Sequence, residues 1–190
     1  MCNVFFAVEE AMKNIICSIN WYETDLDSAW AHIVETYITT KRERRRLYFI
    51  GNGGSAAIAI HMTNDFFKNG GICTHSLHDP ALMTCLANDF GYEYVFSKQL
   101  ELLSQTGDVL TAISSSGNSR NIINAVEVAK GKGCIIVTLS GFKEDNCLRR
   151  MGDVNLYVPS MEYGVVETIH NMILQQVVDD IVKRDGVGLK

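Results

Sequence analysis

No apolar run in this 190-residue sequence approaches the ~20 residues that a membrane-spanning helix needs. The first residues, MCNVFFAVEEAMK, carry acidic side chains where a signal peptide has a basic start followed by an apolar stretch. From these two absences we expect a cytoplasmic protein that does not associate with membranes.

Two further classes of protein are disfavoured by what is missing. The six cysteines, at positions 2, 17, 73, 85, 134 and 147, form no CxxC pair or other metal-type spacing. A disulfide framework is not expected at this length in the cytoplasm, so we expect reduced, mostly buried thiols. The net charge of -5 gives no general surface for nucleic acid.

Nothing divides the chain into parts. It contains only two prolines, Pro80 and Pro159, and it has no low-complexity segment and no repeat of fixed period. With 47% apolar and 21% charged residues, the composition is that of an ordinary globular protein. We therefore predict a single domain over residues 1–190, made of a leading segment (1–45) and an α/β core (46–190).

The leading segment has helical periodicity. Residues 3–20 place apolar side chains such as Val4, Val8 and Met12 on one face, and residues from about 25 to 43 do the same. Because no strand pattern precedes them, these two stretches predict an N-terminal helical hairpin that covers the sheet or packs against another subunit.

From residue 47 onward, short apolar runs alternate with helical stretches. The runs that predict strands are 47–50, 72–77, 109–114, 134–140 and 154–159. The helical stretches lie at about 55–69, 92–104, 118–131, 144–151 and 163–184. This alternation predicts an α/β three-layer sandwich of the flavodoxin-like kind, with a five-stranded parallel sheet and helices on both faces.

Ligands of such sheets bind beyond the carboxyl ends of the strands. The loops at 51–55, 78–90, 114–119 and 140–145 should therefore share one edge. Polar and glycine-rich residues in these loops are the first place to search for a site.

The first loop follows the strand in LYFIGNGGSAAIAIH, residues 47–61. Its glycines permit close approach of the backbone, and the free N–H groups of the following helix favour an anion. A tight structural turn would also use one glycine. The string GNGGSA matches the dinucleotide fingerprint G-x-G-x-x-A, but no acidic residue ends the second strand where a ribose partner is required, so no nucleotide cofactor is expected.

The second loop decides between these interpretations. In VLTAISSSGNSRNIINAVEVA, a strand leads through four serines into another helix. Hydroxyl donors at a helix N-terminus suit a phosphate monoester, whereas a Walker loop has a lysine that is missing here. A simple serine cap is the alternative, although one or two serines would suffice for capping.

These motifs together resemble the sugar isomerase (SIS) domain. The similar segments are GNGGS (51–55), ANDFG (87–91) and ISSSGNS (113–119), and the phosphoheptose isomerases are the most similar members, with the replication-initiator-associating proteins beside them. The resemblance covers essentially the whole chain. It implies a homotetramer with active sites at subunit interfaces and a phosphorylated sugar as ligand.

The resemblance also assigns roles to residues of the loops. It implies that the sugar phosphate is held by Ser114, Ser115, Ser116 and Ser119. It implies that the sugar is lined by Asn52, Gly53, Gly54, Ser55 and Asp89.

The catalytic positions depart from the family pattern. His61 matches a family histidine, but Asp65 stands where the family has glutamate, Glu167 where it has glutamine, and Gln175 where it has the final catalytic histidine. Carried over position by position, the metal set for a divalent ion such as zinc is His61, Asp65, Glu167 and Gln175. The catalytic set is Asp65, His170 and Glu167, with Glu167 and His170 on one helical face as a substitute acid/base pair.

Two functions follow from the resemblance. The first is a phosphosugar isomerase that converts sedoheptulose 7-phosphate to the aldose phosphate used in surface polysaccharides, or acts on a related ketose phosphate. The second is a SIS protein that binds a phosphosugar without isomerising it, as a sensor or as a partner of the replication initiator. Gln175 motivates the second, because an amide does not transfer protons as histidine does.

Overall fold

A seven-stranded sheet organises the chain, in the order β2-β1-β7-β6-β5-β3-β4. The computed structural model describes residues 3–189. Five neighbouring strands run parallel: β3 (Arg46–Ile50), β4 (Cys73–Ser76), β5 (Val109–Ser114), β6 (Ile135–Ser140) and β7 (Val154–Tyr157). The predicted five-stranded parallel core is confirmed, and the complete sheet is two strands larger.

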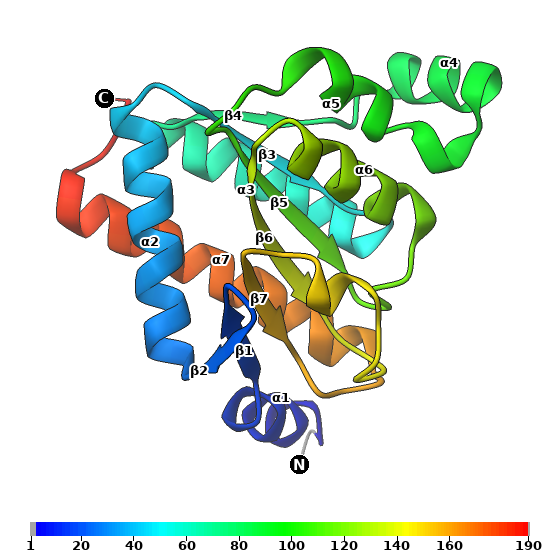
Figure 1. Ribbon diagram of the computed structural model, residues 1–190. Helices are drawn as coiled ribbons and strands as arrows, with labels where there is room; N and C mark the ends of the chain where they lie inside the picture. The colour runs from blue at the N-terminus through cyan, green and yellow to red at the C-terminus, as the bar shows by residue number, and fades with distance from the viewer. Residues whose placement is uncertain (1–2, 190) are drawn as a thin grey trace.

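Helices cover both faces of the sheet (Figure 1), as the three-layer prediction requires. One layer contains α2 (Leu26–Arg42), α3 (Gly54–Lys68) and α7 (Tyr163–Asp185). The opposite layer contains α4 (Pro80–Phe90), α5 (Ser97–Leu103) and α6 (Arg120–Gly131). No helix within residues 3–189 is long and apolar enough to cross a membrane.

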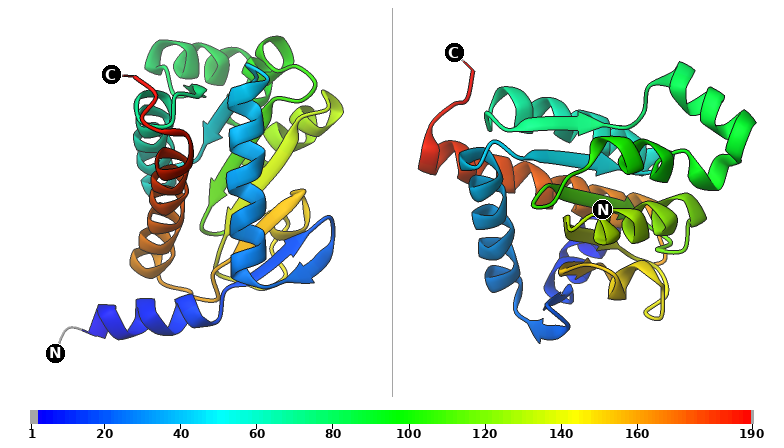
Figure 2. Two further views of the ribbon diagram at one scale, coloured as in Figure 1. Left: turned by 90° about the vertical axis from the view of Figure 1, so that its left-hand side faces the viewer. Right: turned by 45° about the horizontal axis from the view of Figure 1, so that its top comes forward.

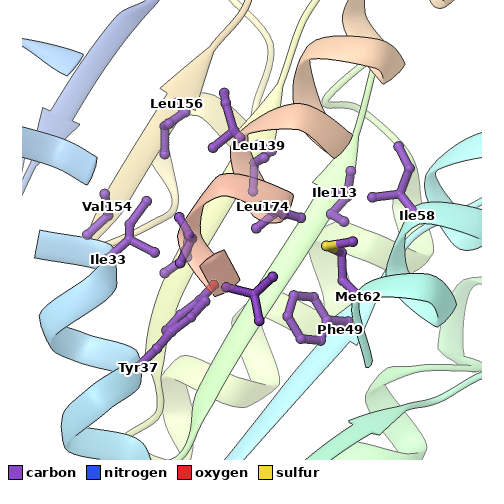
Figure 3. Close-up of a cluster of buried hydrophobic side chains, with 14 of the residues drawn as sticks. Ile33, Tyr37, Phe49, Ile58, Met62, Ile113, Leu139, Val154, Leu156 and Leu174 are labelled. Atoms are coloured by element: carbon purple, nitrogen blue, oxygen red, sulfur yellow. The ribbon is translucent and has the colours of Figure 1, made fainter. Parts of the chain in front are cut away.

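Successive side chains of the strands point to opposite faces of the sheet and pack into two hydrophobic clusters. Leu47 and Phe49 of β3 pack under α2, α3 and α7, whereas Tyr48 and Ile50 pack under the helices of the other layer. Figure 3 shows Phe49 beside Met62 of α3 in the first cluster. Because a strand that is buried on both faces is apolar throughout, these strands appear in the sequence as continuous apolar runs.

The N-terminal helical hairpin is a prediction that the structure corrects. Helix α1 (Asn3–Lys13) ends early, and the chain then forms a β-hairpin of β1 (Ile16–Ile19) and β2 (Tyr22–Thr24) before α2 begins. Strand β1 pairs antiparallel with β7 and so supplies backbone partners to an edge that would otherwise be open. Figure 2 shows α1 extending away from the sheet.

Three further predictions, one loop and two helices on the other side of the sheet, also need correction. Residues 78–90, expected as a loop, contain α4, whose N-cap Asp79 accepts a hydrogen bond from the Leu82 N–H. The helix expected at 92–104 is divided into a short 3₁₀ turn, η1 (Tyr92–Tyr94), and α5. The helix expected at 144–151 is reduced to the 3₁₀ turn η2 (Leu148–Arg150).

The strand order places the site. The chain runs from β3 to β4 on one side of the sheet and then returns to β5 on the other side of β3, so the topology reverses between β3 and β5. In the register of this pair, Ile50 lies opposite Ala112. The loops that follow the two strands therefore emerge side by side, at the position where open α/β sheets bind ligands.

Candidate functional site

The crevice between the two loops is a cavity of about 220 Å³. Its walls are Asn52, Gly53, Gly54, Ser55, Ser114, Ser115, Ser116, Ser119, Tyr163 and Glu167. Every loop residue assigned from the sequence lines this cavity except Asp89. Its lining within the described chain includes no lysine or arginine, so an anion here would meet neutral donors and two helix N-termini.

The first loop needs its glycines for two different reasons. Gly53 adopts φ +54° as the N-cap of α3, a left-handed conformation that favours glycine. Gly54, which opens the helix, has the carboxylate of Glu167 packed so closely that a Cβ would clash with it. The loop therefore brings the backbone N-terminus of α3 and the Glu167 carboxylate into contact.

The second loop is a tight turn lined with hydroxyl groups. The Gly117 N–H donates to the Ser114 carbonyl at 3.0 Å, and Gly117 has φ +63°. The Asn118 N–H donates to Ser116 Oγ at 3.3 Å. Ser115 Oγ is buried and makes no hydrogen bond within the described chain, so this hydroxyl on the cavity wall has its donor and acceptor capacity free for a ligand.

Asn146 packs against Gly117 of the second loop, a role that no sequence motif indicated. Its side-chain amide donates to the carbonyls of Gly141 and Lys143 at 3.1 and 2.9 Å. The neighbouring Leu148 N–H donates to the Gly117 carbonyl at 2.9 Å. Asn146 is buried, is bonded to the 141–143 segment and packs against Gly117, so it supports the turn rather than contacting a ligand.

His78, left unassigned in the sequence, supports the first loop. Its Nε2–H donates to the Gly51 carbonyl at 2.9 Å, and its ring packs edge-on against Phe96. Burial lowers the pKa of His78, and the bond to Gly51 opposes that shift only in part. A neutral imidazole therefore positions the start of the loop.

Tyr163 lines the cavity and was missed by sequence reasoning. It is the first residue of α7, and its ring packs edge-on against Phe142 at 4.7 Å between centroids. An aromatic residue at the start of a helix that follows the last strand was the available signal. Together with Glu167, Tyr163 gives the cavity its only ionisable groups among the described residues.

The remaining catalytic and metal assignments lie away from the cavity wall. His61 Nε2 and Asp65 Oδ2 are 3.4 Å apart on α3, with side-chain exposures of 54% and 21%. Gln175 is half-buried farther along α7, and Asp89 is exposed on α4. In this chain Asp65 and Glu167 are therefore not brought together on the lining of one cavity.

His170 is buried rather than facing the cavity. Its Nε2–H donates to the Ser140 carbonyl at 3.1 Å, and its Nδ1 has no partner within the described chain. Burial lowers the pKa of His170 to about 4, although the bond to Ser140 opposes the shift. The side chain is thus neutral at physiological pH and inaccessible from the cavity, so in this chain it does not form the expected acid/base pair with Glu167.

The proposed zinc ligands do not fit a metal in one chain. Residues 3–189 contain no group of three or more histidine, cysteine, aspartate or glutamate side chains placed to hold an ion. His61 and Asp65 make a pair, while Glu167 lies against Gly54 at the start of the same helix. We therefore derive no step of the chemistry through a metal.

Known proteins of similar sequence belong to the family that the resemblance indicated. The SIS domain family model matches residues 12–141. Phosphoheptose isomerase of Fusobacterium nucleatum is 38% identical over 142 residues, which is 72% of this chain and 73% of that protein. Phosphoheptose isomerase of Cytophaga hutchinsonii is 38% identical over 155 residues, 76% of this chain and 81% of that protein.

A solved structure extends the similarity to nearly the full fold. The phosphoheptose isomerase of Neisseria gonorrhoeae superposes with a TM-score of 0.82 at 30% identity, over 94% of this chain and 93% of that one. The sequence matches, the shared fold and the serine-lined cavity lead to one conclusion. The chain belongs to the SIS domain family and, within it, to the phosphoheptose isomerases.

Proposed function

We propose that this chain is an aldose–ketose isomerase that converts D-sedoheptulose 7-phosphate to D-glycero-D-manno-heptose 7-phosphate. The observation that carries the proposal is the cavity at the carboxyl ends of β3 and β5, which is lined by both a serine cradle and the Glu167 carboxyl group. The phosphate lies among the hydroxyls of Ser114, Ser115, Ser116 and Ser119, and the sugar extends along the first loop toward Glu167.

Glu167 acts as the base in this proposal. A base takes a proton from C1 of the ketose, which gives an enediol, and returns a proton at C2, while a second proton passes from the C1 oxygen to the C2 oxygen. Glu167 has the only carboxylate among the residues that line the cavity. That carboxylate packs against Gly54 at the N-terminus of α3, which places it on the cavity wall before the reaction begins.

Asp65 is the competing assignment for the base, because the resemblance gives it the family's glutamate position. Replacing Glu167 by Gln and, separately, Asp65 by Asn distinguishes the two. We expect Glu167→Gln to lower kcat at least about 100-fold and Asp65→Asn to change it much less. Loss of turnover in Asp65→Asn with normal turnover in Glu167→Gln would overturn the assignment.

The activity itself is tested with purified protein and D-sedoheptulose 7-phosphate, with and without added zinc, by following the aldose product. Turnover supports the isomerase proposal. Absence of product in both conditions, from protein with a normal unfolding transition, would overturn it.

The second candidate function is phosphosugar binding without isomerisation. It is favoured by Gln175, and by the placement of His61 and Asp65 away from the cavity lining. Calorimetry with D-sedoheptulose 7-phosphate separates this candidate from the first. Binding without turnover supports a sensor or a replication-initiator-associating protein.

A homotetramer is also part of the proposal. Val4, Phe5 and Phe6 on α1 are 49%, 76% and 57% exposed, which is unusual for three successive apolar residues unless another surface covers them. Helix α4 has no buried residue and carries Asp89 outward. In the tetramer, a neighbouring subunit covers these helices, and Asp89 then lies toward the cavity of that neighbour. Light scattering, which measures the mass of the assembly, tests this.

A further inference from the structure

The two loops of the cavity are joined by a reciprocal pair of side-chain amides. Asn52 Nδ2 donates to Asn121 Oδ1 at 2.9 Å, and Asn121 Nδ2 donates to Asn52 Oδ1 at 2.9 Å. Asn52 belongs to the first loop, whereas Asn121 is the second residue of α6, which follows the serine loop. Residues 69 positions apart are thus fixed to one another by two hydrogen bonds.

A third side chain breaks the symmetry of this pair. Two facing amides keep both hydrogen bonds if both are rotated by 180°, so the pair alone does not determine which atom of Asn52 faces the cavity. The Tyr92 hydroxyl donates to Asn52 Oδ1 at 2.9 Å. A phenolic hydroxyl is a better donor than acceptor, because its lone pairs are shared with the ring, and it therefore favours the arrangement with the amide oxygen beside it.

Donors then fill both acceptor positions of Asn52 Oδ1. One comes from Asn121 and the other from Tyr92. Of the two Nδ2 protons, one is donated to Asn121. The Asn52 side chain, which lines the cavity, therefore has one N–H left to donate to a ligand.

We propose that Asn121 and Tyr92 are positioning residues that hold Asn52 as a hydrogen-bond donor to an oxygen of the bound sugar. The proposal rests on the proposed function for the identity of that ligand. Asn121 is only 3% exposed and does not line the cavity, so it acts through Asn52 and not on the ligand. The site selects a carbonyl or hydroxyl oxygen at this position.

The amide pair also sets a distance. Asn52 lies in the loop that binds the sugar, and Asn121 lies two residues after Ser119 of the phosphate cradle. The pair therefore fixes the separation between the phosphate donors and the N–H of Asn52. This separation determines how far from the phosphate the recognised sugar oxygen must lie.

A double-mutant cycle tests the positioning role. We expect Asn121→Ala to raise KM for D-sedoheptulose 7-phosphate about tenfold and to have no further effect when Asn52 is already Ala. The inhibition constant of inorganic phosphate, which occupies the serine cradle alone, should be unchanged. Asn124→Ala, one turn later on α6 with its amide bonded to the Glu93 carbonyl, is the matched control and should leave all these constants unchanged.

A purely structural role for Asn121 gives a different pattern. In that case phosphate affinity falls together with sugar-phosphate affinity, or the effects of the two alanine variants add, and either outcome overturns the proposal. If Asn121→Ala unfolds, Asn121→Asp replaces it, because the carboxylate still accepts from Asn52 but no longer donates to it.

A second measurement does not depend on turnover. In the nitrogen-15 NMR spectrum of the free protein, we expect the two side-chain amide protons of Asn52 to be widely separated in shift and one of them to exchange slowly with water. Tyr92→Phe and Asn121→Ala should each reduce that separation and speed the exchange. Widely separated, slowly exchanging Asn52 protons in an inactive protein leave the positioning role standing while the isomerase proposal fails. Freely exchanging Asn52 protons in wild type overturn the positioning role.

Discussion

Substituting Gly54 by Ala tests the placement of Glu167 most directly. A Cβ at Gly54 would lie inside the contact distance of both Glu167 carboxylate oxygens and of its carboxyl carbon. Ordinary contact of a Cβ begins near 3.4 Å, so the carboxylate must retreat by about 1 Å or more. The obstructing atoms are the free end of a flexible side chain, so the backbone need not move.

The expected result is a loss of activity without a loss of stability. A displacement of about 1 Å in a reacting group lowers kcat by roughly 100-fold. Replacing a helical glycine by alanine stabilises a helix by no more than about 1 kcal/mol, which corresponds to a rise in Tm of about 2–4 °C for a chain of this size. Gly54 has a backbone conformation that alanine adopts without strain.

The assay measures aldose formation at saturating D-sedoheptulose 7-phosphate, together with thermal unfolding. Gly131→Ala is the matched control, because this glycine ends α6 at the far end from the cavity and has nothing near its Cβ position. The control should gain stability and keep full activity. Wild-type turnover by Gly54→Ala would refute the role of Glu167 at the start of α3.

Three other predictions concern His170, Gly117 and Ser116. His170 has a folded-state pKa of about 4 against an ordinary value of 6.5, so the unfolded chain binds a proton first as the pH falls. The free energy of unfolding should therefore decrease by about 3 kcal/mol between pH 7 and pH 4. Chemical denaturation at several pH values should show a smaller loss in His170→Gln and an unchanged loss in His32→Asn, which alters an exposed histidine. Gly117→Ala should cost at least about 2 kcal/mol in chemical denaturation, because Gly117 has φ +63° and its Cβ would clash with the buried Asn146 side chain; an unchanged unfolding midpoint would show that the turn is not rigid. Ser116→Ala should weaken binding of inorganic phosphate about tenfold in calorimetry without changing Tm. Ser97→Ala, at a serine that does not line the cavity, should leave phosphate binding unchanged. Equal affinities of wild type and Ser116→Ala would place the phosphate elsewhere.

The serine loop of the cavity was predictable because its signal is local. A strand that ends in serines and is followed by a helix specifies free N–H groups and hydroxyls within a few residues of each other, and Ser114 to Ser119 lie where that pattern placed them. The first loop was predictable for the same reason, since GNGGS joins β3 to α3.

The N-terminal β-hairpin was not predictable in this way. The run Ile15 to Ile19 continues the helical spacing of α1 and fits a short strand equally well. Pairing with β7, more than 130 residues later in the chain, decides the outcome. Helix α4 did have a local signal, Asp79 before Pro80, which is a cap followed by a proline at the first helical position.

The amino-acid sequence by itself determined the parallel core, the two loops that line the cavity and the neutral donors they carry, because periodicity and turn chemistry act over short distances. Only the tertiary structure decided which ionisable groups line the cavity. Glu167 and His170 share a helical face, yet one reaches Gly54 at the cavity and the other is buried against Ser140. Spacing along a helix fixes the relative direction of two side chains, whereas their exposure and partners depend on the elements packed around that helix.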